Sequence, residues 1–281
     1  MAEQVLSAGF LRNEGNWVQW ERDLQFISFG KDSTGPWQGF QAWRADFDSI
    51  LLNRAKVLGV NVLQPCCASR LLVKKNRVIG VETSQGAFRS SFVIDAAGNQ
   101  HWLARQLGLD IDYYSPRLIA RYGYVEGECP TRDDAPVIVA NQQGWTWTAR
   151  VCPQLYQWTR LPFNNEQVGR DWLPNEFHGL KPRGRPCSAD VTWRIVNRPA
   201  GPGYFIAGDA AAVLDPASSH GVLRAIMSGM MAGYMITQIL NCVLVELTGV
   251  QGYRQWVHDW FQHDIGRLRQ LYTILPNSVV F

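Results

Sequence analysis

The segment from Gly208 to Gly229 reads GDAAAVLDPASSHGVLRAIMSG, and it combines a potential ligand-binding carboxylate with many small side chains. The apolar run GYFIA precedes it, so Asp209 is predicted to stand at the carboxyl end of a buried strand, where ligands bind in open α/β sheets. A carboxylate there can accept hydrogen bonds from ligand hydroxyl groups, and the small residues beside it allow close approach to the backbone. We therefore predict a ligand site; the alternative is a plain strand–loop–helix connection with a solvated Asp209.

The end of this segment carries a second chemical feature. Pro216 fixes a bend, and a helix is expected to begin at Gly221, where the free N–H groups of the first turn favour an anionic or electron-rich atom. His220 stands beside this predicted helix start, and its imidazole is a candidate general acid or base. A loop histidine bonded to the backbone is the alternative interpretation.

Other titratable residues are weaker candidates. His258 and His263 are five positions apart on a predicted helix, so they do not share a face as metal ligands would, and no metal site is predicted. Asp259 and Asp264 on the same predicted helix are expected to be solvated.

The elements that position these groups are predicted from hydrophobic periodicity. A helix is expected over Phe47–Leu58, and Gly59 should stop it before a strand at VNVLQ, residues 60–64. Three short strands should follow, and the last ends in VIDAAG, as a buried parallel strand meets a ligand loop. Their predicted ranges are Ser69–Val73, Val78–Thr83 and Ala87–Ile94.

The middle of the chain changes character. Residues 116–163 alternate apolar and polar positions between turns, which is typical of an antiparallel sheet, and after Gly208 the chain should be mainly helical to about residue 275. The predicted fold is therefore mixed α/β, with an α/β portion split around an inserted antiparallel sheet and a helical C-terminal tail. The predicted parts are a partial ligand-binding portion over residues 1–112, a sheet domain over 113–190, and the second strand–helix motif with C-terminal helices over 191–281.

Composition excludes several classes of function. The chain has 281 residues, 46% of them hydrophobic and 18% charged, with a net charge of +3 and no Lys/Arg block that would suit nucleic acid. Its six cysteines form no Cys-x-x-Cys pair, so we expect a reducing cytoplasm and mostly buried, inert thiols. Met230–Val250 is apolar, but Gln238, Asn241 and Glu246 interrupt it, which favours a buried helix over a membrane span.

Three stretches together resemble one known family. GDAAAVLDPASSHGVLRAIMSG is similar to the second FAD motif of the flavin-dependent monooxygenase superfamily, and its DPxxSxGV spacing resembles the halogenase-like branch. GFQAWRADFDSILLNRAKVLGVNV resembles the family's Arg-x-x-Phe-Asp helix, and VIDAAGNQHWLARQLGL resembles its Asp-Ala-x-Gly segment. The order and the separation of the three also match, so the resemblance covers about residues 17–275.

The resemblance implies a cofactor and its contacts. Asp209 would bond a hydroxyl of the ribityl chain of FAD, and the backbone from Pro216 to Gly221 would line the flavin ring. The family's halide contacts would fall on the backbone amides of His220 and Gly221. The residues that the resemblance brings to FAD are Gly208, Asp209, Ala210, Pro216, Ser219, His220 and Gly221, with Gln41 and Arg44 near the diphosphate and Ala97 and Gly98 near the nucleotide. The alternative for Arg44 is a surface ion pair with Asp48.

The chain also departs from the family pattern. It has no G-x-G-x-x-G, since Gly9 and Gly15 do not make that spacing, so we expect the family's first nucleotide-binding unit to be absent. The reactive lysine of halogenases has no counterpart, because Lys31 lies in a turn-rich loop. The family's W-x-W-x-I-P signature is kept only as Trp145 and Trp147, which we expect to pack on the sheet.

The expected function is an FAD-dependent, monooxygenase-like oxidation of an aromatic or related small molecule, with NAD(P)H or a reductase as electron donor. Regular halogenation is disfavoured by the missing lysine. The alternative is a non-catalytic or partner-dependent protein that does not hold FAD alone, in which a second chain or a second copy completes the site.

Overall fold

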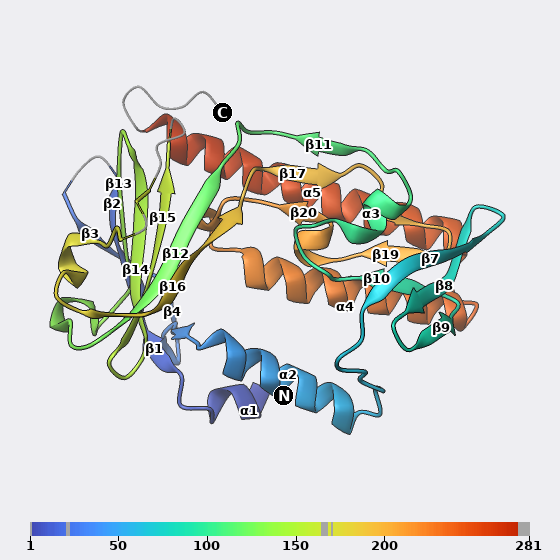
Figure 1. Cartoon of the computed structure of the whole chain (residues 1–281), viewed down its shortest axis with the longest axis horizontal. Helices are drawn as coiled ribbons and strands as arrows, with labels where there is room; N and C mark the ends of the chain where they lie inside the picture. The colour runs from blue at the N-terminus through green and yellow to red at the C-terminus, as the bar shows by residue number, and fades with distance from the viewer. Residues whose placement is uncertain (1, 21–22, 164–167, 170, 275–281) are drawn as a thin grey trace. The chain divides into compact units, whose positions relative to one another are not determined.

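The chain divides into two compact units, each built from segments that are far apart in the sequence (Figure 1). The structure is a computed structural model and describes residues 2–20, 23–163, 168–169 and 171–274. The first unit contains the described parts of residues 1–62 and 118–189 together with Thr273 and Ile274, and the second contains residues 63–117 and 190–272. Residues 1–62 thus join the sheet unit, whereas the sequence-based division placed residues 1–112 together.

A seven-stranded sheet dominates the first unit, in the order β16-β12-β15-β14-β13-β2-β3. Most of its paired strands are antiparallel, as expected, but β13 runs parallel to β2, with Val137 opposite Trp17. The strands are β2 (Gly15–Trp20), β3 (Gln25–Ser28), β12 (Ile119–Glu126), β13 (Val137–Asn141), β14 (Gly144–Cys152), β15 (Leu155–Pro162) and β16 (Lys181–Asp190).

The two faces of this sheet carry different residues, because successive side chains on a strand point to opposite sides. Trp145 and Trp147 share one face; Trp145 is fully buried there and Trp147 is half-buried. The other face holds Trp158, whose indole lies over its cross-strand partner Gly123 so closely that a Cβ on Gly123 would come within 2.9 Å of it. We call this second face the Trp158 face. Its core cluster comprises Val125, Cys129, Tyr156, Trp158 and Phe177.

The remainder of the first unit consists of short elements and one long helix. Helix α2 (Arg44–Val57) confirms the expected helix, although none of its residues is fully buried, and Gly59, at φ +89°, follows its end. The strand expected at residues 60–64 is wrong: the run is irregular, and Val60 is exposed, because no neighbouring strand pairs with it. The short elements are α1 (Ala2–Leu6), β1 (Leu11–Asn13), β4 (Lys31–Asp32), β5 (Gly35–Pro36) and β6 (Gly39–Gln41).

The second unit contains three small sheets of three strands each. At its centre β10 (Val93–Asp95) and β19 (Tyr204–Ile206) are parallel neighbours, so the two apolar runs form strands as predicted. The expected strand Ala87–Ile94 splits into β9 and β10. The other strands are β7 (Ala68–Lys74), β8 (Arg77–Thr83), β9 (Gly86–Arg89), β11 (Ile111–Tyr113), β17 (Arg194–Val196), β18 (Ala200–Gly201) and β20 (Ala212–Val213).

Three helices complete the second unit: α3 (Trp102–Gln106), α4 (Gly221–Leu240) and α5 (Glu246–Thr273). The buried helix expected over Met230–Val250 is wrong, because α4 ends at Leu240, α5 begins at Glu246, and much of this stretch is exposed. No helix in the described part of the chain is long and apolar enough to cross a membrane. The exposed side of α4, which we call its outer face, carries Leu223, Ile226, Met227, Met230 and Tyr234.

Candidate functional site

The segment from Gly208 to Gly221 connects β19 to α4 through two 3₁₀ turns and the short strand β20 (Figure 1). The first turn, Gly208–Ala210, needs its glycine: Gly208 has φ +58°, and a Cβ there would lie 3.3 Å from the Cβ of Ala225 on α4. The Gly208 N–H donates to Ser228 Oγ of α4 at 2.8 Å. The turn is therefore fastened directly to the helix that follows it.

A buried histidine, His101, forms a hydrogen bond with the same turn. His101, only 1% exposed, has its Nδ1 2.8 Å from the carbonyl oxygen of Ala210, and its Nε2 lies 2.8 Å from Nε of Arg194. Because an arginine only donates, Nε2 must be the acceptor, so Nδ1 carries the proton and donates to Ala210. Burial also lowers the pKa of His101, which keeps the imidazole neutral.

Arg194 continues this network to the neighbouring loop. Its Nη1 donates to Asp190 Oδ1 at 3.0 Å, and its Nη2 donates to the carbonyl oxygen of Asn99 at 3.1 Å. Asn99 directly follows Ala97 and Gly98. The loop after β10 and the turn after β19 are thus held by one side-chain network, as two halves of one ligand site would require.

The second turn, Pro216–Ser218, is capped by a buried carboxylate. Asp215 is fully buried and accepts the N–H of Ala217 at 2.7 Å, while the Tyr272 hydroxyl of α5 donates to its other oxygen. Tyr253, also on α5, donates to the carbonyl oxygen of Ile206 at 2.8 Å, and burial raises its pKa. Helix α5 therefore supports the segment on both sides of the first turn.

His220 pairs with an aspartate that the sequence did not indicate. Its Nδ1 lies 3.0 Å from Asp264 Oδ1 of α5, and Asp264 is 1% exposed, so the expectation that Asp264 is solvated is wrong. The Arg224 guanidinium lies beside this carboxylate, with Nε 3.7 Å from Asp264 Oδ2. Burial lowers the pKa of Arg224, while the charges of Asp264 and Asp209 raise it. The cluster places one imidazole, one guanidinium and two carboxylates around the start of α4.

The predicted contact residues differ in accessibility. Asp209, Pro216, Ser219, Gly221 and Ala97 are exposed. Gly208, Gly98 and His220 are half-buried, whereas Ala210 is buried and uses its carbonyl oxygen for His101. Ala210 therefore serves the shape of the turn, and the accessible groups are the Asp209 carboxylate and the backbone at the start of α4.

Gln41 and Arg44 lie in the first unit, away in sequence from the groups above. Gln41 Nε2 donates to Asn13 Oδ1 at 3.1 Å, and Arg44 forms the alternative ion pair with Asp48, at 3.1 Å between two exposed side chains. An exposed pair of this kind contributes little to stability and can be exchanged for a ligand. The convergence of these two residues with the Gly208–Gly221 segment stays a prediction.

The groups present fit one part of FAD. An accessible carboxylate suits a ribityl hydroxyl, a glycine turn lets the backbone approach a ligand, and the first-turn N–H groups of α4 suit an electron-rich ring atom. Sequence reasoning missed His101, Arg194 and Asp264, which position these groups. For Asp264 a signal existed, because it lies on the apolar stripe of Val257, Phe261 and Leu268.

The chain was compared with known proteins. Residues 25–155 match a family model described as tryptophan halogenase. A tryptophan 2-halogenase of Chondromyces crocatus is 25% identical over 275 residues, covering 85% of this chain and 51% of the relative. A 1H-pyrrole-2-carbonyl peptidyl-carrier-protein brominase of Pseudoalteromonas luteoviolacea is 26% identical over 245 residues, covering 77% and 59%. The chain thus spans about half the length of the curated relatives it matches.

Comparison with solved structures also points to flavin-dependent halogenases. The crystal structure of CmlS, a flavin-dependent halogenase, superposes with a TM-score of 0.84 at 18% identity, over 99% of this chain and 56% of that one. The chain therefore has the fold of the flavin-dependent halogenases, and its resemblance to the halogenase-like branch of the flavin-dependent monooxygenases is confirmed.

Proposed function

We propose that the protein is an FAD-dependent oxidoreductase that acts, in the manner of a monooxygenase, on an aromatic or related small molecule. The observation that carries the proposal is the exposed Asp209 carboxylate beyond a glycine turn that Ser228 and His101 hold in place. When bound, the flavin supplies the electron transfer to dioxygen that amino-acid side chains lack.

The chain's own residues would bind and orient the cofactor. Asp209 accepts a hydrogen bond from a ribityl hydroxyl, and the N–H groups at the start of α4 stabilise negative charge on the ring. His220 is the candidate proton-transfer group: Asp264 orients its Nδ1, which leaves Nε2 as the nitrogen that gives or takes a proton. These roles, and those of Gln41, Arg44, Ala97 and Gly98, are part of the proposal.

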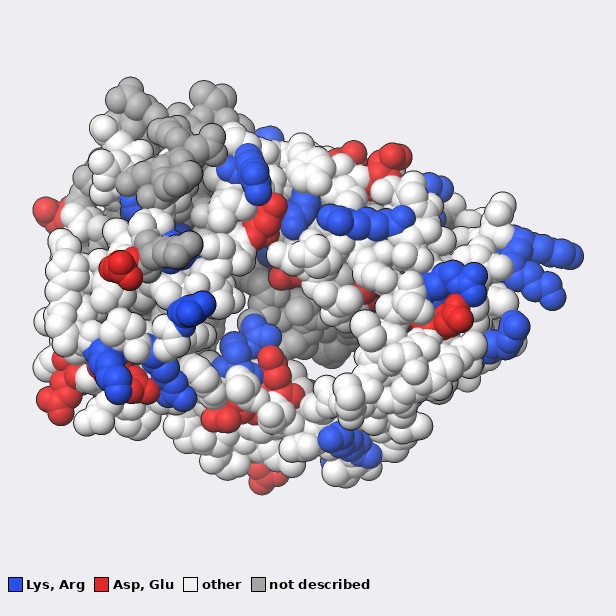
Figure 2. Space-filling model, viewed as in Figure 1, with Lys and Arg blue, Asp and Glu red and all other residues white. Residues whose placement is uncertain are grey.

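The proposal also covers the electron donor, the cell compartment and the class of substrate. NAD(P)H or a reductase serves as the electron donor, and the cytoplasm is the proposed compartment. All six cysteines are free, but three of them, Cys67, Cys187 and Cys242, are exposed, so the expectation of mostly buried thiols is wrong. On the face shown in Figure 2, basic and acidic side chains of the described residues are interspersed, which suits a small-molecule substrate better than nucleic acid.

The visible spectrum of the purified protein tests the proposal. We expect a flavin absorbance band after purification or after addition of FAD, and Asp209→Ala should weaken FAD binding about tenfold or more, since a charge-assisted hydrogen bond is lost. Asp259→Ala is the matched control, because the exposed Asp259 carboxylate accepts a hydrogen bond from Gln255 of the same helix, and its loss should leave FAD affinity unchanged. A chain that stays colourless with excess FAD contradicts autonomous binding.

The outer face of α4 favours a second candidate function, in which the chain holds FAD only together with another polypeptide. Its five large apolar side chains are between 37% and 65% exposed, and such a contiguous patch marks an interaction surface. The proposed occupant is a separate polypeptide that would contribute contacts to the diphosphate of FAD. Native mass spectrometry tests this: a colourless monomer that turns yellow only in a heteromeric complex supports it, whereas a flavin-bound monomer or homodimer overturns it.

A further inference from the structure

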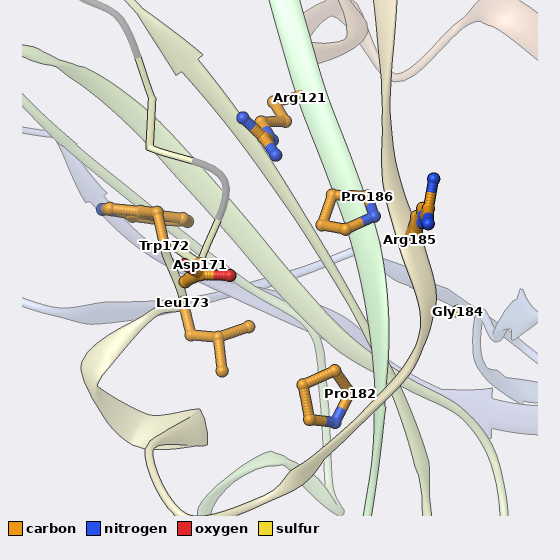
Figure 3. Close-up of a pocket in the computed structure, with 8 residues that line it drawn as sticks. All are labelled: Arg121, Asp171, Trp172, Leu173, Pro182, Gly184, Arg185 and Pro186. Atoms are coloured by element: carbon orange, nitrogen blue, oxygen red, sulfur yellow. The ribbon is translucent and has the colours of Figure 1, made fainter.

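Two features of the protein surface have no role in the functions proposed above. The first is a pocket of the first unit that Trp172, Pro182 and Pro186 line (Figure 3). The Arg121 guanidinium of this pocket donates to the carbonyl oxygen of Val168 at 2.6 Å, so it is already bound within the chain. The second feature is the end of the second unit where α4 meets α5, and there exposed apolar and basic side chains stand together.

The turn between α4 and α5 presents exposed apolar side chains on a fixed backbone. The N–H groups of Val243 and Leu244 both donate to the carbonyl oxygen of Gln238, at 2.9 Å and 3.2 Å. Leu244 is turned inward, so that a Cβ on Gly249 would lie 3.1 Å from its Cδ2. The residues that remain outside are between 56% and 72% exposed, and we call them the apolar corner: Leu240, Val243, Val245 and Leu247. Such a group of exposed apolar side chains is typical of an interaction surface.

The hairpin of β7 and β8 carries basic side chains at the same end of the second unit. Lys74 and Lys75 stand exposed at its tip, and Arg89 is exposed on the neighbouring strand β9. Figure 2 shows basic side chains gathered where Figure 1 places this hairpin. We call these three residues the basic group.

An ion pair joins the hairpin to the apolar corner. Arg77 follows the hairpin tip, and its Nη1 lies 2.6 Å and 2.7 Å from the two carboxylate oxygens of Glu246. Glu246 stands between Val245 and Leu247 of the corner, and it also accepts the N–H of Gly203 at 3.0 Å. The basic group and the apolar corner are therefore parts of one surface, and each is held in place relative to the other.

The charge of this surface is positive. Besides Glu246, the only Asp or Glu in residues 66–94 and 238–256 is Glu82, and Arg70 Nη2 lies 2.6 Å from its carboxylate. Both carboxylates are thus paired with arginine, whereas no member of the basic group forms an ion pair with another described residue. The surplus charge is that of the basic group.

We propose that this surface binds an anionic lipid bilayer, with the apolar corner in the boundary between headgroups and acyl chains and the basic group against the anionic headgroups. The two features are complementary to a bilayer, because its surface is negative and the layer beneath is apolar. Burial of the corner and attraction of the basic group act together, and the attachment is peripheral and reversible.

This surface lies apart from the proposed flavin site. Helix α4 runs 20 residues from Gly221 to Leu240, which is about 30 Å, and the apolar corner stands at the end opposite to Gly221. The corner also shares no residue with the outer face of α4. Lipid binding and FAD binding are therefore separate measurements, and either proposal can fail without the other.

Co-sedimentation with lipid vesicles tests the charge preference. The probes are vesicles of phosphatidylcholine alone and of phosphatidylcholine mixed with anionic phosphatidylglycerol. We expect at least about tenfold tighter binding to the mixed vesicles, since each Lys or Arg near an anionic surface contributes about fivefold. Lys74→Gln with Lys75→Gln should remove about tenfold or more of this affinity. Lys31→Gln with Lys56→Gln is the matched control, because both lysines are exposed in the first unit, and it should change nothing. Equal binding to the two vesicle types, or binding to neither, overturns the proposal.

A second pair of variants tests insertion of the corner. Val243→Asn with Val245→Asn should weaken binding to the mixed vesicles about tenfold or more, because two apolar side chains no longer leave water. Val57→Asn with Leu58→Asn is the matched control, since these residues are 75% and 67% exposed in the first unit. Circular dichroism confirms that the variants fold. Unaltered binding of the corner variant would mean adsorption by charge alone and would refute insertion.

Cys242 offers a position for a reporter at the corner, because it is exposed between Leu240 and Val243. An environment-sensitive fluorophore on Cys242, with the other accessible cysteines replaced by serine, should shift its emission to shorter wavelength when mixed vesicles are added. The same fluorophore on Cys187, an exposed cysteine of the first unit, should not shift. A shift at Cys187 alone places the lipid elsewhere. A shift at Cys242 without vesicles, together with an oligomer in native mass spectrometry, identifies a polypeptide as the occupant and overturns the assignment.

Discussion

The second unit contains two parallel strands whose ends look alike in sequence and behave differently. β10 runs into Asp95-Ala-Ala-Gly98, and β19 runs into Ala207-Gly208-Asp209. Asp95 is 4% exposed and accepts the N–H groups of Ala97 and Leu103, both at 2.8 Å. Asp209 is exposed, because Ser228 and His101 hold its turn instead. At these two strand ends, the aspartate that caps its own turn is buried, and the aspartate whose turn is held by other groups is exposed.

The largest loss of stability is expected when Asp95 is replaced, because Asp95 holds the turn that follows it. Asp95→Ala removes a buried acceptor from two backbone N–H groups, so we expect a loss of about 3 kcal/mol or more in the free energy of unfolding. Asp209→Ala is the comparison and should cost less than Asp95→Ala, because Asp209 is exposed and does not cap the backbone of a buried turn. Chemical denaturation measures both. Similar losses in the two variants would contradict the division of roles between them.

The glycines beside these aspartates, Gly98 and Gly208, also differ between the two strand ends. Gly98 and Gly208 both have positive φ, +84° and +58°, but a Cβ at Gly98 meets open space, whereas one at Gly208 meets Ala225 at 3.3 Å. We expect Gly98→Ala to cost about 1 kcal/mol from backbone strain alone, and Gly208→Ala about 2 kcal/mol because α4 must also shift. Denaturation midpoints of the two variants test this, and equal costs would show that the contact with α4 is soft.

The smallest effect concerns the pH dependence of the turn after β19. Burial holds the pKa of His101 below its ordinary value of 6.5 in the folded chain. As the pH falls through that value, the unfolded chain takes up a proton that the folded chain does not, so stability is lost on acidification by at most about 1.4 kcal/mol per pH unit. His101→Gln should flatten this part of the stability profile between about pH 7.5 and pH 5.5. An unchanged slope would mean that another group causes it.

Local patterns predicted a good part of the molecule. The helical spacing of apolar residues in α2, the alternation of the central sheet and the apolar runs of β10 and β19 each identify their element. The predicted ligand segment also has the small-residue turns and the helix start that its composition indicates.

The remaining features depend on contacts that no local pattern encodes. The break between α4 and α5 contains neither glycine nor proline, and Cys242 adopts φ +57° there, so the stretch reads as one helix. His101 also has a left-handed conformation, at φ +51°, and its partners Ala210 and Arg194 are about a hundred residues away. The irregular run at residues 60–64 lacks a partner strand, which decides against β structure whatever its propensity.

Helix α5 connects distant points of the ligand segment. Tyr253, Asp264 and Tyr272 reach the strand end at Ile206, His220 and Asp215 respectively, and they span 19 residues, or about 28 Å, of one helix. Because the three contacts stand on one continuous helix, a rigid displacement of that helix would alter all three contacts at once. The strand end, the capped turn and the imidazole are therefore joined through a single element.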